Sequence, residues 1–387
     1  MKFLARSVSA ALAVGLLAQP LPLASQESPP AQAPVRDNLY EKSLKAAVEA
    51  LKVYGVWDAP AEQARLNELG YRVAQESGFR EYPISFSLID MPEPNAFALP
   101  GGQIFVTRGM LSLGLTDDEL AALLGHEIAH VVHEHGTRIQ RRATLLNVLT
   151  QALVLGLALS ADRRPDPVPG DPYGYGRGGG DLVTGSYAAG MIVSELLLRS
   201  YSREFEDEAD EDGQRWAAAA GFAPDGTGRL MKVLGSRLPE SGDYGYWRTH
   251  PFFAQRVTAA EARGRGLARG DEKPAAEFRS WSQRRLLDLG AGQSAESPEG
   301  LFVASTALAT WPRGAEAERL RLDRIHRARA STLEAIPLSR DYGALLRTYD
   351  REIEDVATLD PDSSLLGKLG TEREALAAEA RELLPEA

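Results

Sequence analysis

The chain has no cysteine among its 387 residues. This absence excludes disulfide bonds, zinc sites with cysteine ligands, thiol catalysis and lipid attachment through a cysteine. Positive charge is also in deficit, because 43 Lys and Arg residues stand against 54 Asp and Glu residues, a net charge of −11. An acidic chain without a basic cluster repels phosphate backbones, so we expect no nucleic-acid partner. Histidine is scarce, and five of the six lie at positions 126, 130, 133, 135 and 250, which is not the scatter of structural histidines.

The N-terminus lacks a hydrophobic run long enough to span a membrane. Lys2 and Arg6 precede an apolar stretch over residues 8–18, about half of the roughly 20 residues that a membrane-spanning helix needs. Small residues follow, so residues 1–25 have the layout of a secretory signal peptide. Residues 26–37 form a proline-rich leader. Export of a chain without cysteine predicts a periplasmic protein that could also associate with the membrane.

Hydrophobic spacing predicts the order of the first elements. Residues 38–54 and 60–76 place apolar side chains at helical intervals. Residues 83–90 and 101–109 read as two strands joined by a turn-rich segment. A capping-box pattern then begins a helix that we expect over residues 117–140.

The second half of the chain differs from the first in composition. Two apolar stretches within residues 143–198 flank a loop rich in proline and glycine. Their spacing favours two buried core helices, with a hairpin that covers a cleft or touches the membrane surface as the alternative. The polar residues that interrupt them argue against a membrane span. Residues 263–387 are polar and helical, so we divide the chain into a domain over 38–262 and a C-terminal extension.

The expected third helix carries the strongest chemical signal, the pattern HExxH. His126 and His130 lie four residues apart, so both imidazoles emerge on one helix face and can bind one metal ion. Glu127 lies about a quarter turn away from them. There it can reach a water molecule at the metal without becoming a ligand, which suits a general base.

A catalytic zinc site needs a third protein ligand and leaves one position open. The segment SREFEDEAD, residues 202–210, offers five carboxylates, and spacing alone does not choose among them. A ligand carboxylate and a carboxylate that orients a ligand histidine should share one helix face. Both Glu206 with Asp210 and Glu204 with Glu208 meet this condition, so the residues leave the choice open.

Five sequence blocks support a family resemblance by their order, namely LPGGQIFVTRGML, LLGHEIAHVVHEHG, SREFEDEAD, AGFAPDG and THPFFAQRV. In this order they resemble the HtpX-like zinc metallopeptidases, the family that includes the CAAX prenyl proteases and the soluble periplasmic BepA-type enzymes. The resemblance implies a gluzincin with one Zn²⁺ per chain, held by His126, His130 and Glu206. It also implies Glu127 as the base, and Asp210 as the carboxylate that holds a ligand in place. The implied fold is α+β and mostly helical, with a zincin-like core, a small antiparallel sheet and a helical C-terminal extension.

The remaining histidines differ in what they imply. In the resembling family the segment around His250 lies at the active site. There His250 would either donate to the oxyanion or occupy the open zinc position as a fourth ligand; taken locally, the segment is only a turn with a structural histidine. Arg256 is a further candidate beside the site. We expect His135 to cap or pack the helix end and His133 to be solvated.

The predicted function is that of a zinc metalloendopeptidase for misfolded or unassembled cell-envelope proteins, in which Glu127 activates a water molecule at the zinc. The strand over residues 103–107 is expected to form a sheet edge that pairs with an extended substrate. One alternative is an assembly or chaperone-like factor with a silenced protease site, whose envelope-protein partners dock through residues 263–387. A weaker alternative is a zinc hydrolase that acts on peptidoglycan peptides. Residues 143–198 are the candidate for peripheral membrane contact.

Overall fold

The computed structural model describes residues 37–139, 201–238, 246–251, 253–294, 296–334 and 341–383. All of them belong to one compact unit, Val35–Ala387. The expected signal peptide, the leader and the apolar stretches of residues 143–198 lie outside the described residues, so they stay predictions. Among the helices that are described, none combines the length and the hydropathy needed to cross a bilayer.

Three strands form a small mixed sheet in the order β1-β3-β2. The strands are β1 (Ser85–Ile89), β2 (Ala96–Ala98) and β3 (Gln103–Thr107). β1 pairs with β3 in parallel, whereas β2 pairs with β3 antiparallel. The sheet is therefore mixed, and the wholly antiparallel sheet that the family resemblance implied is wrong. The turn-rich segment between β1 and β3 contains β2, which takes the hairpin position beside β3 and leaves β1 the parallel register on the other side.

The expectation that residues 103–107 form a sheet edge is also wrong. β3 is the central strand, and all five of its residues are buried. The outer side of β1 is partly covered by Gln63, whose amide donates to the carbonyl of Phe86 at 3.0 Å and accepts from the N–H of Leu88 at 3.1 Å. The Gln63 side chain therefore makes hydrogen bonds that a neighbouring strand would make to β1. β2 is the other edge of the sheet.

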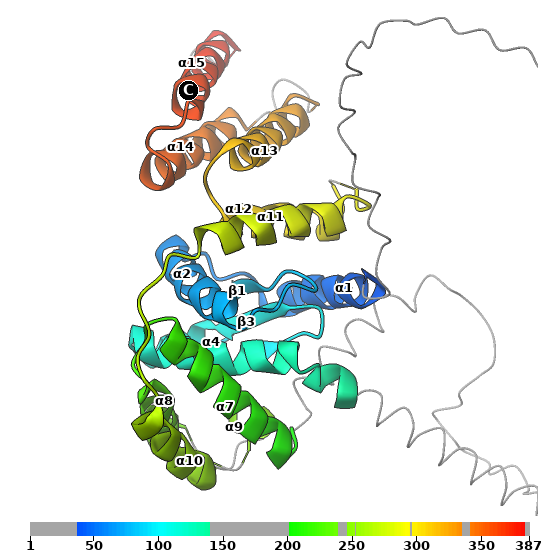
Figure 1. The fold of residues 1–387 in the computed structure, drawn as a ribbon. Helices are drawn as coiled ribbons and strands as arrows, with labels where there is room; N and C mark the ends of the chain where they lie inside the picture. Colours follow the sequence, from blue (N-terminus) through cyan, green and yellow to red (C-terminus); the bar gives the residue numbers. More distant parts are fainter. Residues whose placement is uncertain are drawn as a thin grey trace, which may run out of the picture. The chain divides into compact units, whose positions relative to one another are not determined.

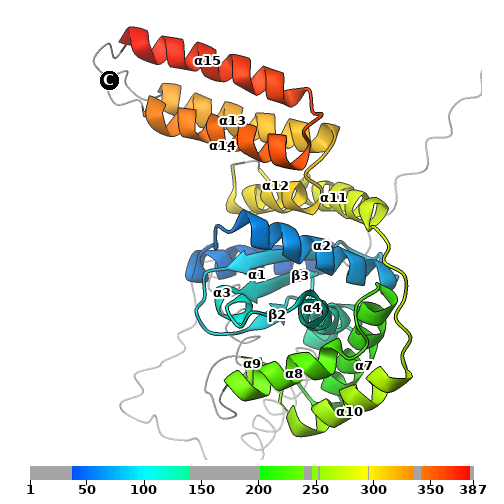
Figure 2. The same ribbon diagram turned by 90° about the vertical axis from the view of Figure 1, so that its left-hand side faces the viewer.

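The sheet lies between two layers of helices (Figures 1 and 2). On one side lie α1 (Asp37–Tyr54) and α2 (Pro60–Glu76), which bury one face each, as the spacing predicts. On the other side lies α4 (Asp117–Val132), which is buried along almost its whole length because it is apolar nearly all round. The predicted α+β, mostly helical fold is confirmed.

The two ends of α4 have different outcomes. At its start, the capping box of Thr116 and Glu119 is present as predicted. At its end, the expectation of a helix to residue 140 is wrong, because α4 stops at Val132 and Glu134 adopts a left-handed backbone with φ 53°. Such a conformation is uncommon for a residue other than glycine, and it separates α4 from the helical residues 135–139 that follow.

α4 contacts a layer of further helices. They are α7 (Arg203–Ala219), α8 (Gly226–Arg237), α9 (Tyr246–Thr249) and α10 (Phe253–Gly266), and a short α3 (Arg108–Leu111) precedes α4. α4 and α7 approach most closely at Gly125 and Gly213, where a Cβ added to Gly125 would lie 2.5 Å from the carbonyl oxygen of Gly213. Two residues without side chains therefore let the two helix backbones touch.

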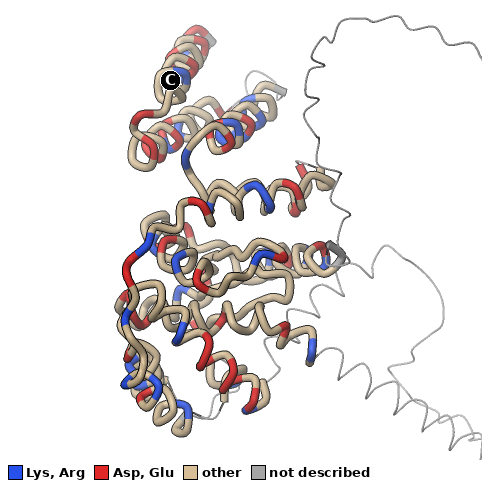
Figure 3. The backbone as a smooth tube through the Cα atoms, viewed as in Figure 1, with Lys and Arg blue, Asp and Glu red and all other residues tan. Residues whose placement is uncertain are grey.

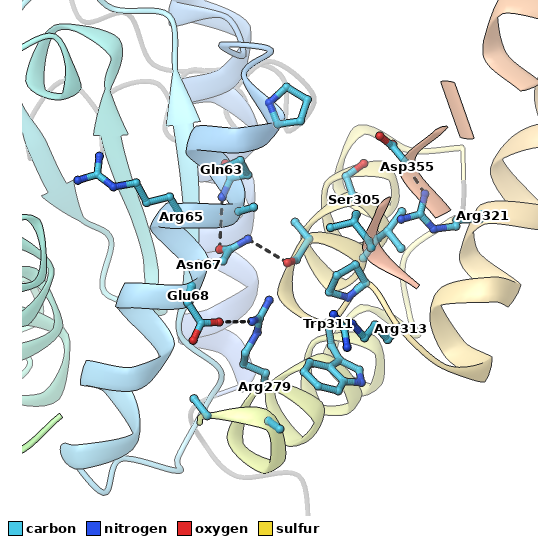
Figure 4. Close-up of a pocket in the computed structure, with 18 of the residues that line it drawn as sticks. Gln63, Arg65, Asn67, Glu68, Arg279, Ser305, Trp311, Arg313, Arg321 and Asp355 are labelled. Carbon is cyan, nitrogen blue, oxygen red and sulfur yellow. Dashed lines mark hydrogen bonds and ion pairs between the residues drawn. The ribbon is translucent and has the colours of Figure 1, made fainter. Parts of the chain in front are cut away.

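The C-terminal helices divide between two hydrophobic clusters. The helices are α11 (Ala276–Gly290), α12 (Pro298–Thr310), α13 (Ala315–Glu334), α14 (Tyr342–Leu359) and α15 (Leu365–Leu383). α11 and α12 share the large core with the sheet, whereas α14 and α15 pack with α13 around a second cluster that includes Ile325 and Tyr349. A cavity of about 680 Å³ lies where α2 faces α11 and α12 (Figure 4). It is bridged by Asn67, which donates to the carbonyl of Ala309 at 2.9 Å, and by the ion pair of Glu68 with Arg279.

Candidate metal centre

α4 and α7 supply most of the candidate site. His126, Glu127 and His130 lie on α4, and Glu206 and Asp210 lie on α7, where acidic residues follow one another along the helix (Figure 3). These five side chains are all buried, whereas most other acidic residues of α7 reach solvent. The glycine contact between the two helices brings the buried set together.

Four side chains converge on one point. One atom each from His126, His130, Glu206 and His250 lies within 4.8 Å of the others, a group that could hold a metal ion. The Nε2 atom of His126 lies 3.0 Å from Nε2 of His130 and 3.1 Å from Nδ1 of His250. The Nδ1 atom of His250 lies 3.0 Å from Oε1 of Glu206. Three imidazoles and one carboxylate are a donor set that zinc sites use.

The protonation of His126 is fixed from the side away from this point. Its Nδ1 lies 2.9 Å from Oδ1 of Asp210. Burial acts to raise the pKa of Asp210, but the Arg256 guanidinium and the hydrogen bonds from His126 and Arg256 together hold it well below its usual range. An ionised carboxylate only accepts hydrogen bonds, so its position beside Nδ1 favours the tautomer of His126 that has its proton on Nδ1 and a bare Nε2 toward the other donors.

The group therefore fits a metal ion. Burial lowers the pKa of His126, His130 and His250, which keeps their imidazoles neutral and able to donate lone pairs. A bare Nε2 of His126 that faces further acceptors at about hydrogen-bond distance is costly in a buried place unless a cation lies among them. Burial also raises the pKa of Glu206 to about 7, which a positive charge at this point would oppose.

Arg256 ties the carboxylates of the site together. It lies on α10 and is 1% exposed. Its Nε donates to Oδ2 of Asp210 at 2.7 Å, its Nη2 donates to Oδ1 of the same residue at 2.8 Å, and its Nη1 contacts Glu206. Nη1 also donates to the backbone carbonyl of His250 at 3.1 Å. One guanidinium thus holds the carboxylates from α7 and the turn that carries His250.

Glu127 differs from the other buried carboxylates. Neither of its oxygens has a hydrogen-bond partner within the part of the chain that the structure describes, and Nε2 of the neutral His250 ring lies 3.5 Å from Oε1. Burial, reinforced by the charge of Glu206, raises the pKa of Glu127 well above its usual value. A buried carboxyl group with free oxygens beside a possible metal site is suited to receive a proton.

His250 is held between two aromatic rings. The ring of Tyr246 stacks on it at 4.5 Å and the ring of Tyr201 at 5.4 Å. The N–H of Tyr246 donates to the carbonyl of Pro94 at 3.2 Å, just before β2. The turn that carries His250 is therefore tied to the start of the edge strand.

Of the residues proposed from the sequence, the structure brings His126, Glu127, His130, Glu206, Asp210, His250 and Arg256 together. The expectation of a solvated His133 is wrong, since it is half-buried and its Nε2 lies 2.8 Å from Oδ2 of Asp212. His135 does pack at the end of α4, but its ring faces His130. Sequence reasoning missed the two tyrosines, because nothing in their spacing relates them to the HExxH helix.

Comparison with known proteins agrees with this geometry. Residues 60–264 match Peptidase family M48. The chain is 27% identical over 251 residues to a putative beta-barrel assembly-enhancing protease of Vibrio cholerae, covering 64% of this chain and 48% of that protein. It is 29% identical over 209 residues to the beta-barrel assembly-enhancing protease of Escherichia coli K12, covering 52% of this chain and 38% of that protein.

A eukaryotic relative gives a similar alignment. The mitochondrial metalloendopeptidase OMA1 of Schizosaccharomyces pombe is 28% identical over 191 residues, which cover 49% of each chain. The chain thus spans about half the length of these curated relatives, or less. The resemblance found in the sequence is confirmed for the family as a whole. Because the matched residues 60–264 make up more than half of the chain and include every candidate ligand, the chain belongs to Peptidase family M48.

Proposed function

We propose that the chain is a zinc-dependent endopeptidase that uses His126, His130 and Glu206 as metal ligands. The observation that supports this most directly is the convergence of buried ligand atoms within 4.8 Å in a chain of this family. Bound zinc supplies Lewis-acid activation of a water molecule and of the scissile carbonyl. One zinc ion per chain is expected.

The protein's own groups then move the proton. Glu127 takes it from the attacking water and passes it to the leaving amine. Its free oxygens and raised pKa support this role. Asp210 and Arg256 do not touch the substrate in this proposal. They hold His126 and Glu206 in place through the contacts at 2.9 Å and 2.7 Å and the contact of Arg256 with Glu206.

We propose that His250 is the fourth donor to the metal in the resting chain. Its Nδ1 belongs to the convergent group, and two tyrosine rings hold it there. If it is a plug, replacing it with alanine raises peptidase activity. If it is instead the oxyanion donor, the same variant loses activity on the order of 10²–10³-fold while it keeps its zinc.

The substrate is proposed to add a strand to β2 instead of β3. β2 is an edge strand that packs against α4, the helix that carries His126 and His130, so this edge lies beside the site. Pairing through the main chain tolerates many side chains, which suits an enzyme for unfolded proteins. Because two relatives carry the name beta-barrel assembly-enhancing protease, we propose cell-envelope proteins as substrates and the periplasm as the location. We also propose that such proteins dock through residues 263–387 and that residues 143–198 contact the membrane.

The metal and the base can be tested in one experiment on the purified full chain. We expect about one zinc ion per chain, cleavage of casein, and loss of cleavage with a chelator that added zinc reverses. The Glu127→Gln variant should keep its zinc and lose activity by about 10²–10⁴-fold. Asp207→Asn, an exposed neighbour of Glu206, is the matched control and should cleave normally. A Glu127→Gln variant that still cleaved casein at the wild-type rate would disprove the proposed mechanism.

A second function, assembly of envelope proteins with a silent protease site, is favoured by one observation, the place of His250 among the ligand atoms. Under this alternative the Glu127→Gln variant would still suppress aggregation of an unfolded β-barrel protein. The peptidase proposal predicts instead that the substrate is cleaved by the wild-type chain and not by the Glu127→Gln variant.

A further inference from the structure

A hydrogen-bonded chain of side chains leads from the metal centre to the surface. The Nδ1 atom of His130 lies 2.8 Å from Nδ1 of His135. On its other side, Nε2 of His135 lies 3.0 Å from Oε2 of Glu208. His135 is fully buried, whereas the side chain of Glu208 is 39% exposed. None of the roles proposed above uses either residue.

The order of donors and acceptors along this chain follows from its outer end. The carboxylate of Glu208 can only accept, so Nε2 of His135 donates to it. A neutral imidazole has a single N–H, so Nδ1 of His135 must accept, and the proton between the two rings belongs to His130. His130 is thereby protonated on Nδ1. Its Nε2 is left bare, and this is the atom that lies 3.0 Å from Nε2 of His126 and 3.5 Å from Oε1 of Glu206.

Ring packing and the backbone hold the two imidazoles in this orientation. Phe205 stacks on His135 with ring centroids 4.4 Å apart and planes inclined by 13°. Tyr201 stacks on His130 at 3.9 Å and 21°. The left-handed backbone of Glu134 interrupts the helix between these two histidines. Rotation of either ring would break these stacks as well as the hydrogen bonds.

We propose that His135 and Glu208 are positioning residues that keep the proton of the neutral His130 ring on Nδ1 and aim its Nε2 at the metal. The two metal-facing histidines of α4 then have separate supports, since Asp210 acts on His126 directly and Glu208 acts on His130 through His135. Partners of this kind commonly change metal affinity by about 10–100-fold. The inference rests on the proposed function, because it takes His130 as a ligand.

The test is the zinc dissociation constant of the full apo-chain, measured by competition with a chromophoric chelator. His135→Leu removes the acceptor and should weaken zinc binding by about 10–100-fold. His135→Gln should restore most of the affinity, because its carbonyl can accept from His130 while its amide donates to Glu208. Glu208→Ala should cause a smaller loss, because water can replace an exposed carboxylate. His133→Gln is the control, since His133 also touches Glu208 but not the metal ligands, and its affinity should equal that of the wild type.

Far-UV circular dichroism of each apo-variant checks that it is folded. Wild-type zinc affinity in folded His135→Leu overturns the inference and leaves the proposed function intact. Equal losses in His135→Leu and His135→Gln also overturn it, since packing would then explain both. If His135→Leu does not fold, the comparison of His135→Gln and Glu208→Ala with wild type decides. A wild-type chain that binds no zinc contradicts the proposed function itself, and the inference with it.

Discussion

Two buried arginines show how differently one kind of ion pair can be used in this molecule. Arg256 contacts Asp210 and Glu206 in the metal centre, and Arg321 on α13 contacts Glu352 on α14 at 2.7 Å. Both guanidinium groups are almost fully buried. They differ in what surrounds them, because the partners of Arg256 also contact His126 and His250, whereas Glu352 contacts only arginines in the described residues.

The difference shows what identifies a site in a folded chain. A buried ion pair alone is compatible with a purely structural role, as between α13 and α14. At the metal centre, the pair lies beside a carboxyl group whose two oxygens have no partner among the described residues, and beside nitrogens that face one another. Unmatched acceptors, and not buried charge, distinguish the functional region from the structural one.

The largest expected effect in this comparison comes from Arg256→Met. The substitution leaves two buried carboxylates without their common cation, so the apo-chain should lose about 3–5 kcal/mol of unfolding free energy. Urea unfolding of the apo-chain measures this loss. Saturating zinc should recover part of it, because the metal replaces some of the missing positive charge. An unchanged unfolding midpoint would contradict the view that Arg256 compensates these carboxylates.

The contact between α4 and α7 gives the next largest effect. In Gly125→Ala the new Cβ would lie 2.5 Å from the Gly213 carbonyl oxygen, which belongs to a backbone and cannot turn away. The helices must separate, and we expect a loss of about 3 kcal/mol in stability. Zinc affinity should fall as well, since His126 and Glu206 lie on opposite sides of this contact. Normal zinc affinity in a folded variant would show that the helix spacing does not set the ligand geometry.

Features that depend on neighbouring residues were predicted from the sequence, whereas features that depend on contacts between distant residues were not. The helices of residues 38–54 and 60–76, and the capping box at residue 116, follow from local spacing and are present. The HExxH pattern likewise placed two histidines and a glutamate on one helix. The mixed sheet could not be derived in this way. Its strand β2, Ala96–Ala98, lies inside a turn-rich segment, and only tertiary pairing makes these residues a strand.

The choice of the third ligand shows the same limit at the site. Spacing allowed either Glu206 with Asp210 or Glu204 with Glu208, and only the family resemblance selected Glu206. In the structure Glu206 is fully buried beside the histidines, while Glu208 reaches His135. His135 packs at the end of α4 as expected, but its contact with His130 was not predicted. The left-handed backbone of Glu134, which no local pattern predicts, interrupts the helix between these two histidines.

For the structural pair, Arg321→Met should cost less than the change at Arg256. Arg324 also contacts Glu352, so the carboxylate keeps a cation after the substitution. We expect a loss of about 1–3 kcal/mol in unfolding free energy, measured by urea unfolding. Zinc affinity and casein cleavage of the folded protein should equal those of the wild type. A change in zinc affinity would show that α13 and α14 are coupled to the metal centre.

The smallest expected effect comes from Gly370→Ala, the same substitution at a glycine that has no close neighbour among the described residues. Gly370 lies within α15, and a Cβ added there would meet nothing within 4 Å, in contrast to the backbone that faces Gly125. Because alanine favours the helix over glycine, Gly370→Ala should stabilise the chain by up to about 1 kcal/mol. The same substitution thus has opposite signs in the two regions. Should the thermal midpoint of Gly370→Ala fall instead of rise, the free side of α15 must be in contact with something.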